Sequence, residues 1–279
     1  MADEIVDALG TSPFDGREFR WRMGVKALDR AGWLQIDRHR ESDLAEKGRL
    51  LTGRFGDVVA FAEASYQAET EVLELVVDAL AMNHLSIDRE IESHPLVTAG
   101  RYIQEDLCLL EKRPSGWVLT GGMVCFPTRW HLREKIGRPI GEIHAPVPGM
   151  EAISTTIDRF FDRMKPGSIV SRSNWSLTDD GSLRLQPTVG ESATAMPADP
   201  ARGLWLRVER QTIRKLTTEN AICFTIRIHR WALGEVVDQL PAAALSAALA
   251  GMPSEIAGYK DIEGYRDDLI AWLNARHRR

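Results

Sequence analysis

Residues 104–148 read QEDLCLLEKRPSGWVLTGGMVCFPTRWHLREKIGRPIGEIHAPVP, and the pattern changes twice within this stretch. Two strand-like runs flank a turn signal at residues 114–116, which predicts a β-hairpin. A charged segment over residues 128–136 follows, and Thr128 can cap a short helix there. The stretch ends with His144 and an Ala-Pro-Val-Pro segment. Because proline fixes φ and donates no hydrogen bond, we expect an extended backbone after His144 and a well-placed imidazole.

The second strand-like run contains Gly121 and Gly122, which weaken it as a strand. Adjacent glycines inside a strand indicate a β-bulge or a place where a flat group lies against the backbone. The sequence leaves both interpretations open.

Three further segments favour strands, because apolar and polar residues alternate along them or turn signals bound them. The predicted fold is α+β, with an antiparallel sheet whose strands lie near residues 104–111, 117–125, 169–177, 204–213 and 221–230. A helical connection over residues 128–164 joins the first hairpin to the other strands, and this order is typical of PAS-like domains. We expect the pocket between that connection and the sheet, with few polar groups and apolar walls from Phe126, Val147, Phe224 and Ile226.

The flanking regions are predicted to be helical extensions of this core. Residues 1–100 form an N-terminal extension packed on the core, residues 101–235 the core, and residues 236–279 C-terminal helices. Within the N-terminal extension, the sequence predicts an irregular arm (1–24), a loop (27–37), a helix (42–51) and one or two amphipathic helices (57–85). The C-terminal helices are predicted over residues 242–250 and 259–273.

Composition limits the function classes. The chain has 279 residues, 44% hydrophobic and 27% charged, which is a globular balance, and its formal charge of -5 argues against a nucleic-acid binder. Cys108, Cys125 and Cys223 lie far apart in apolar runs, which indicates buried free thiols in a reducing compartment. Without a cationic leader or a long apolar run, the expected location is the cytoplasm, with no membrane contact.

Several cations lie in segments where they need a partner. Strand alternation places Arg210 on the side of Leu204, Leu206 and Val208, where either a buried ion pair or an anionic ligand explains it. The cations Arg129, Arg133 and Lys135 in the connection can meet an anionic ligand, or they form a solvated helix face.

A resemblance to a known family rests on segments spread over most of the chain. They read MGVKALDRAGWLQID (23–37), QEDLCLLEK (104–112), VCFPTRW (124–130), EKIGRPIGEIHAPVP (134–148), SRSNW (171–175) and RVERQTIRKL (207–216). Together they resemble the haem-dependent oxidative N-demethylase family, which is related to the haem subunit of dimethylamine monooxygenase. The resemblance implies a PAS-like monooxygenase that holds haem b, activates O2, oxidises a small secondary amine and releases formaldehyde. It also implies a separate flavin and iron–sulfur reductase and a homo- or hetero-oligomer.

With that family in view, His144 is the expected proximal haem ligand, with His131 and His229 as alternatives. The haem propionates need cations, for which Arg210 and Arg172 rank ahead of the group containing Arg129. A protonated amine favours a carboxylate, and Glu209 is the candidate catalytic residue. Trp175 and Phe224 are expected to wall the cofactor pocket, although a buried tryptophan also fits plain core.

Two other function classes remain open. A PAS-like domain can bind haem as a sensor or interaction module without turnover, and a family member can lose haem and serve as a structural subunit. A Soret band would exclude the structural subunit, and reductase-driven formaldehyde release would separate the enzyme from the sensor.

Overall fold

One antiparallel sheet of seven strands runs through the part of the chain that the structure describes. The structure is a computed structural model, and it describes residues 2–9, 24–88, 90, 94–145, 147–149, 151–187, 195–217 and 220–277. The strand order is β1-β5-β6-β7-β3-β4-β2. The strands are β1 (Lys26–Leu28), β2 (Val59–Phe61), β3 (Asp106–Arg113), β4 (Gly116–Met123), β5 (Ile169–Thr178), β6 (Trp205–Lys215) and β7 (Ala221–Ala232).

The predicted α+β fold with an antiparallel sheet is confirmed, and the order of its elements is compatible with a PAS-like arrangement. β3 and β4 form the first hairpin, β6 and β7 form the second, and β3 pairs with β7 to join them. The helical connection between β4 and β5 contains α5 (Leu132–Lys135), α6 (Ile140–Ile143) and α7 (Glu151–Arg163). All five strands predicted from alternation and turn signals are present within a few residues of the expected limits.

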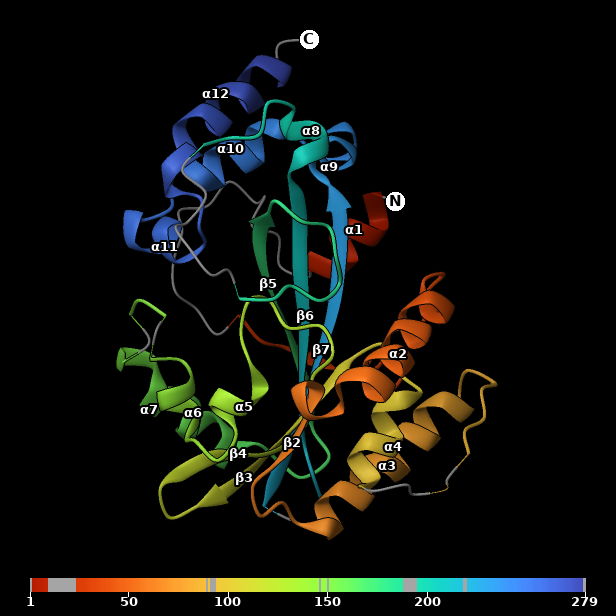
Figure 1. The fold of residues 1–279 in the computed structure, drawn as a ribbon. Coiled ribbons are helices and arrows are strands. Elements are labelled where there is room, and N and C mark those ends of the chain that lie inside the picture. Colours follow the sequence, from red (N-terminus) through yellow and green to blue (C-terminus); the bar gives the residue numbers. More distant parts are fainter. Residues whose placement is uncertain are drawn as a thin grey trace.

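The helices gather at the two ends of the sheet (Figure 1). α2, α3 and α4 lie at one end, and α8 to α12 lie at the other. Their limits are α1 (Ala2–Leu9), α2 (Arg40–Val58), α3 (Tyr66–Ala81), α4 (Pro95–Arg101), α8 (Pro200–Gly203), α9 (Leu233–Gln239), α10 (Ala242–Ala250), α11 (Ser254–Tyr259), a 3-10 turn (Glu263–Tyr265) and α12 (Arg266–His277).

The two faces of the sheet bury different apolar clusters. Leu206 and Val208 of β6 pack with α1 and the C-terminal helices, whereas Ile213 of β6 packs with α7. Because side chains alternate along a strand, Glu209 and Gln211 lie on the face of Ile213. We call this the α7 face, and we call the side that carries Leu206 and Val208 the opposite face.

Several predictions for the flanks are wrong. Residues 2–9 of the predicted irregular arm form a helix, while residues 10–23 lie outside the described residues. The predicted loop over residues 27–37 contributes to β1. Of the one or two helices predicted over residues 57–85, α3 is present, but the segment begins with the end of α2 and the strand β2. Both strands are three residues long, and each pairs with a segment distant in sequence, so local periodicity carries no signal for them.

The two interpretations of the glycine pair are both partly right. The pairing of β3 with β4 shifts between Leu109 and Leu110, which is a bulge beside Gly121. A Cβ atom on Gly121 would lie 2.9 Å from the Phe61 ring of β2. The flat group against the backbone is therefore a side chain of this chain, and not a ligand.

The three cysteines are buried and free, as predicted. Burial raises the pKa of the Cys125 and Cys223 thiols to about 12, and it raises the pKa of Cys108 as well. They are inert core residues. Among the described ranges, no helix combines the length and the apolar character needed to cross a membrane.

Candidate functional site

A polar cluster lies on the α7 face around Glu209, near the middle of β6. Its Oε1 accepts a hydrogen bond of 2.5 Å from Thr128 Oγ1, and its Oε2 accepts one of 3.1 Å from Gln211 Nε2. Thr128 Oγ1 in turn accepts a bond of 2.9 Å from Arg207 Nε. The Thr128 hydroxyl accepts the hydrogen bond from Arg207 and donates its own proton to Glu209. Thr128 and Gln211 together fix the direction of the Glu209 carboxylate.

Arg172 lies beside Glu209 on β5. The strand register pairs Asn174 with Glu209 and Arg172 with Gln211, which brings these side chains to one face. Burial lowers the pKa of the Arg172 guanidinium, and the charge of Glu209 acts in the opposite direction. The Arg172 Nε is buried and has no hydrogen-bond partner among the described residues. This guanidinium is therefore available to an anion.

His144 follows α6, and the charges of Arg172 and Glu209 act on it. Its Nδ1 lies 2.9 Å from the Ile140 carbonyl oxygen, which only accepts, so Nδ1 carries the proton and Nε2 keeps a free lone pair. Burial lowers the pKa of His144, and the charges of Lys135 and Arg172 lower it further. The hydrogen bond to Ile140 and the charge of Glu209 raise the pKa, but they do not cancel this effect. The side chain is therefore a neutral imidazole with one nitrogen ready to bind a metal.

The reason for the position of His144 differs from the prediction. The backbone after His144 is not extended, because Val147 N donates a hydrogen bond of 2.8 Å to the His144 carbonyl oxygen and closes a turn. His144 itself is the C-cap of α6 (φ -99°, ψ 2°). Pro146 lies outside the described residues. The end of a helical turn fixes this imidazole.

The C-terminal region adds a residue that the sequence did not suggest. Lys260, directly after α11, donates to the Trp175 carbonyl oxygen and, at 3.3 Å, to Asn174 Oδ1. Burial lowers the pKa of Lys260 to about 8, the Glu209 charge opposes this, and the Arg172 charge adds to it. The cluster is thus more polar than the predicted pocket.

The remaining sequence candidates divide between this cluster and other roles. Phe224 of β7 pairs with Ile213 of β6, and both lie on the α7 face. Trp175 packs against the cluster of the C-terminal helices, with Lys260 over its ring at 5.4 Å. Arg129 forms ion pairs with Asp179 (2.5 Å) and Asp261 (3.1 Å), so its charge is already matched.

Arg210 and His229 lie on the opposite face, and the guanidinium of Arg210 is not part of the cluster around Glu209. Arg210 donates to the carbonyl oxygens of Gly32 (2.5 Å) and Trp33 (3.3 Å). The backbone of that loop satisfies this cation. A cavity of about 30 Å³ at the β5 edge is lined partly by Arg172 and Arg210, and it has room for about one water molecule.

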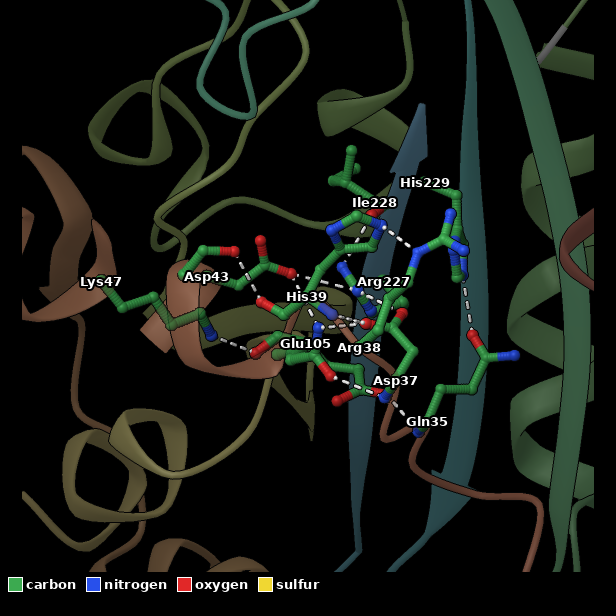
Figure 2. A network of polar contacts seen from close by, with 12 residues as sticks. Gln35, Asp37, Arg38, His39, Asp43, Lys47, Glu105, Arg227, Ile228 and His229 are labelled. Atoms are coloured by element: carbon green, nitrogen blue, oxygen red, sulfur yellow. Dashed lines mark hydrogen bonds and ion pairs between the residues drawn. The ribbon is translucent and has the colours of Figure 1, made fainter. Parts of the chain in front are cut away.

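Figure 2 shows the polar network that surrounds His229 and its neighbour Arg227. His229 Nε2 lies 2.8 Å from Gln35 Oε1, and its ring stacks on Trp231. Arg227 pairs with Asp37 (2.6 Å) and Asp43 (3.1 Å). These contacts belong to the packing of residues 35–43 on the opposite face of the sheet.

We expect His229 to make the fold acid-sensitive. Its pKa is lowered to about 3, chiefly by burial and also by the Arg227 charge, whereas an unfolded histidine titrates near 6.5. Between these two pH values His229 binds a proton in the unfolded chain but not in the folded chain. The free energy of unfolding therefore falls as the pH decreases from about 6.5 towards 3. His229→Phe keeps a ring to stack on Trp231. It should reduce the loss of unfolding free energy across this pH range by on the order of a few kcal/mol.

Urea unfolding at several pH values between 4 and 7.5 measures this slope. The exposed His84, changed to Asn, is the matched control and should keep the wild-type slope. If His229→Phe and the wild type show the same dependence on pH, then burial of His229 does not govern acid sensitivity.

Comparison with known families adds one finding. The profile described as "Haem-dependent oxidative N-demethylase, alpha subunit-like" matches residues 82–270. The chain belongs to this family. The match contains the sheet from β3 to β7, the connection with His144, and the C-terminal turn with Lys260.

The cluster suits the haem that the family name specifies. A metal-binding histidine usually donates its second ring N–H to a carboxylate or carbonyl, which His144 does toward Ile140. The buried Arg172 Nε without a partner fits a haem propionate, a group that accepts charge-assisted hydrogen bonds. His131 is the N-cap of α5, and its side chain makes no capping hydrogen bond.

Proposed function

We propose that this chain binds haem b through His144 and, with O2 and electrons supplied from outside, removes a methyl group from a small secondary amine as formaldehyde. The observation that carries the proposal is the imidazole of His144, whose Nδ1 is committed to the Ile140 carbonyl oxygen, and which lies close enough to Arg172 and Glu209 for their charges to act on it. Membership of the haem-dependent family supports the same assignment.

Each residue has a distinct role in this proposal. His144 would hold the iron through Nε2, Arg172 would bind a propionate, and Phe224 would contact the porphyrin from the sheet. Haem, when bound, supplies the site at which O2 is activated. The family describes an alpha subunit, and a separate flavin and iron–sulfur reductase would deliver the electrons. The buried free thiols suit the reducing cytoplasm.

Glu209 would bind the ammonium form of the amine and accept its proton before oxidation. The reaction balances as one amine N–CH3 group, O2, two electrons and two protons giving an N–H group, formaldehyde and water. Because Thr128 and Gln211 fix the Glu209 carboxylate, its position is set before the substrate arrives.

Changing Glu209 to Gln should lower formaldehyde release at least about tenfold, because the neutral amide can neither pair with an ammonium group nor accept its proton. The amide oxygen can still accept from Thr128, so the fold should be kept. Formaldehyde formed per NADPH, with a partner reductase and dimethylamine, measures the effect. Glu235→Gln on the exposed surface of α9 is the matched control.

The same assay distinguishes an enzyme from a haem-binding sensor without turnover. A wild-type protein with a Soret band, a working electron supply and no formaldehyde from a series of small methylamines would favour the sensor. A Glu209→Gln variant as active as the wild type would instead keep the enzyme and remove Glu209 from its mechanism.

A further inference from the structure

The turn that carries Lys260 has a fixed backbone. After α11, Asp261 N donates to Gly258 O (3.0 Å) and Ile262 N donates to Ala257 O (3.0 Å). This pair of bonds is the Schellman motif that ends many helices, and Asp261 takes the left-handed conformation (φ 56°) that usually belongs to glycine. The buried Ile262 anchors the turn in the C-terminal core, so Lys260 emerges in one direction.

Asp261 also fastens the turn to the sheet. Its carboxylate pairs with Arg129 at 3.1 Å, and the same guanidinium pairs with Asp179 at 2.5 Å, just after β5. Arg129 therefore joins the connection after β4, the end of β5 and the C-terminal turn. An aspartate at a left-handed position costs free energy relative to glycine, and the ion pair gives a reason for its presence there.

Lys260 extends from this turn to the cluster, and among the described residues no carboxylate forms an ion pair with its ammonium group. Its Nζ makes two hydrogen bonds, to the Trp175 carbonyl oxygen and Asn174 Oδ1, and an ammonium group has three donors. Among the described residues, no carboxylate oxygen lies within 4.0 Å of Nζ. The pKa lowered to about 8 has the same cause, because burial removes water and no close anion replaces it.

We infer that Lys260 binds a carboxylate of the ligand in this site, and that this carboxylate is a haem propionate. The inference rests on the proposed function. Lys260 contacts Asn174, which pairs with Glu209 in the strand register, and Arg172 lies two residues before Asn174 on the same face. Two cations therefore lie beside Glu209, and haem carries two propionates. A carboxylate on the amine substrate is the other source of the same chemistry, and the experiment separates the two.

Haem titration of the apoprotein tests this inference. Lys260→Met should weaken binding of ferric protoporphyrin IX roughly 10- to 100-fold, the range for one hydrogen bond to a charged group, and Lys260→Arg should restore most of it. With the dimethyl ester of the same iron porphyrin, which has no carboxylates, the wild type and Lys260→Met should bind equally. The exposed Lys165, changed to Met, is the control and should change neither titration.

Asp261→Asn tests the role of the turn in positioning Lys260. Asparagine tolerates the left-handed conformation but cannot pair as an anion with Arg129. We expect weaker binding of the haem and unchanged binding of the ester, with a smaller effect than in Lys260→Met.

Two outcomes would overturn the inference alone. If Lys260→Met binds haem as tightly as the wild type does, Lys260 does not bind a propionate. The same conclusion follows if the variant binds the dimethyl ester as much more weakly than the wild type as it binds haem. If haem binding is unchanged while the KM for a carboxylate-bearing amine rises, the substrate is the source of the carboxylate. A wild type that binds neither porphyrin would contradict the proposed function as well.

Discussion

His144→Ala is expected to abolish the Soret band of the native complex or to shift it strongly, because the change removes the only ring nitrogen assigned to the iron. The lost hydrogen bond to Ile140 is a single bond at a half-buried site and should cost about 1 kcal/mol of unfolding free energy. The absorption spectrum of the reconstituted variant and its urea midpoint measure the two effects separately.

Added imidazole should restore part of the Soret band in His144→Ala, because a free ligand can occupy the space that the side chain leaves. His131→Ala and His229→Ala are the matched variants, and both should keep the native spectrum. If His144→Ala keeps the native spectrum and one of these two variants loses it, the ligand is misassigned while the haem proposal survives.

Arg207→Met should destabilise the protein by about 3–5 kcal/mol, the range for breaking a buried charged network. Arg207 is 1% exposed and donates to Thr128 Oγ1 and to three carbonyl oxygens, those of Phe126, Ser182 and Leu183. Methionine has similar length but leaves these acceptors without a donor. Urea unfolding at constant pH gives the difference in free energy.

Arg202→Met is the control for that measurement, since its side chain is 91% exposed and should change stability by less than about 0.5 kcal/mol. Arg207 also orients Thr128, and through it Glu209. Demethylation should therefore be slower in Arg207→Met even at urea concentrations where the variant is still folded. A variant within 1 kcal/mol of the wild type would show that water replaces the guanidinium at its acceptors.

The sequence predicted the sheet well because its central strands are long and alternate strictly. β6 and β7 contain 11 and 12 residues, and their polar and apolar positions separate two buried faces. β1 and β2 have three residues each, and both exist because a distant partner supplies the hydrogen bonds. Pattern reasoning within a window cannot find such strands.

The candidate site was predictable in part. His144, Arg172 and Glu209 lie within the residues that the family model matches, and the fold brings their charges within reach of one another. Arg210 follows Glu209 directly, so strand alternation already requires that the two side chains point to opposite faces. The fold keeps to that parity, because the Arg210 guanidinium donates to the carbonyl oxygens of Gly32 and Trp33 on the opposite face. Lys260 had no local signal, because the ion pairs of Arg129 bring its turn to the sheet.

The placement of β1 at the edge beside β5 has a consequence during synthesis. Lys26 pairs with Ser171, and a ribosome adding 5–20 residues per second needs roughly 7–30 seconds to make the intervening chain. Over that time the first edge strand waits without its partner, while β2 can pair with β4 much earlier. The nascent sheet therefore closes at one edge first, and the other edge closes only after β5 has been made.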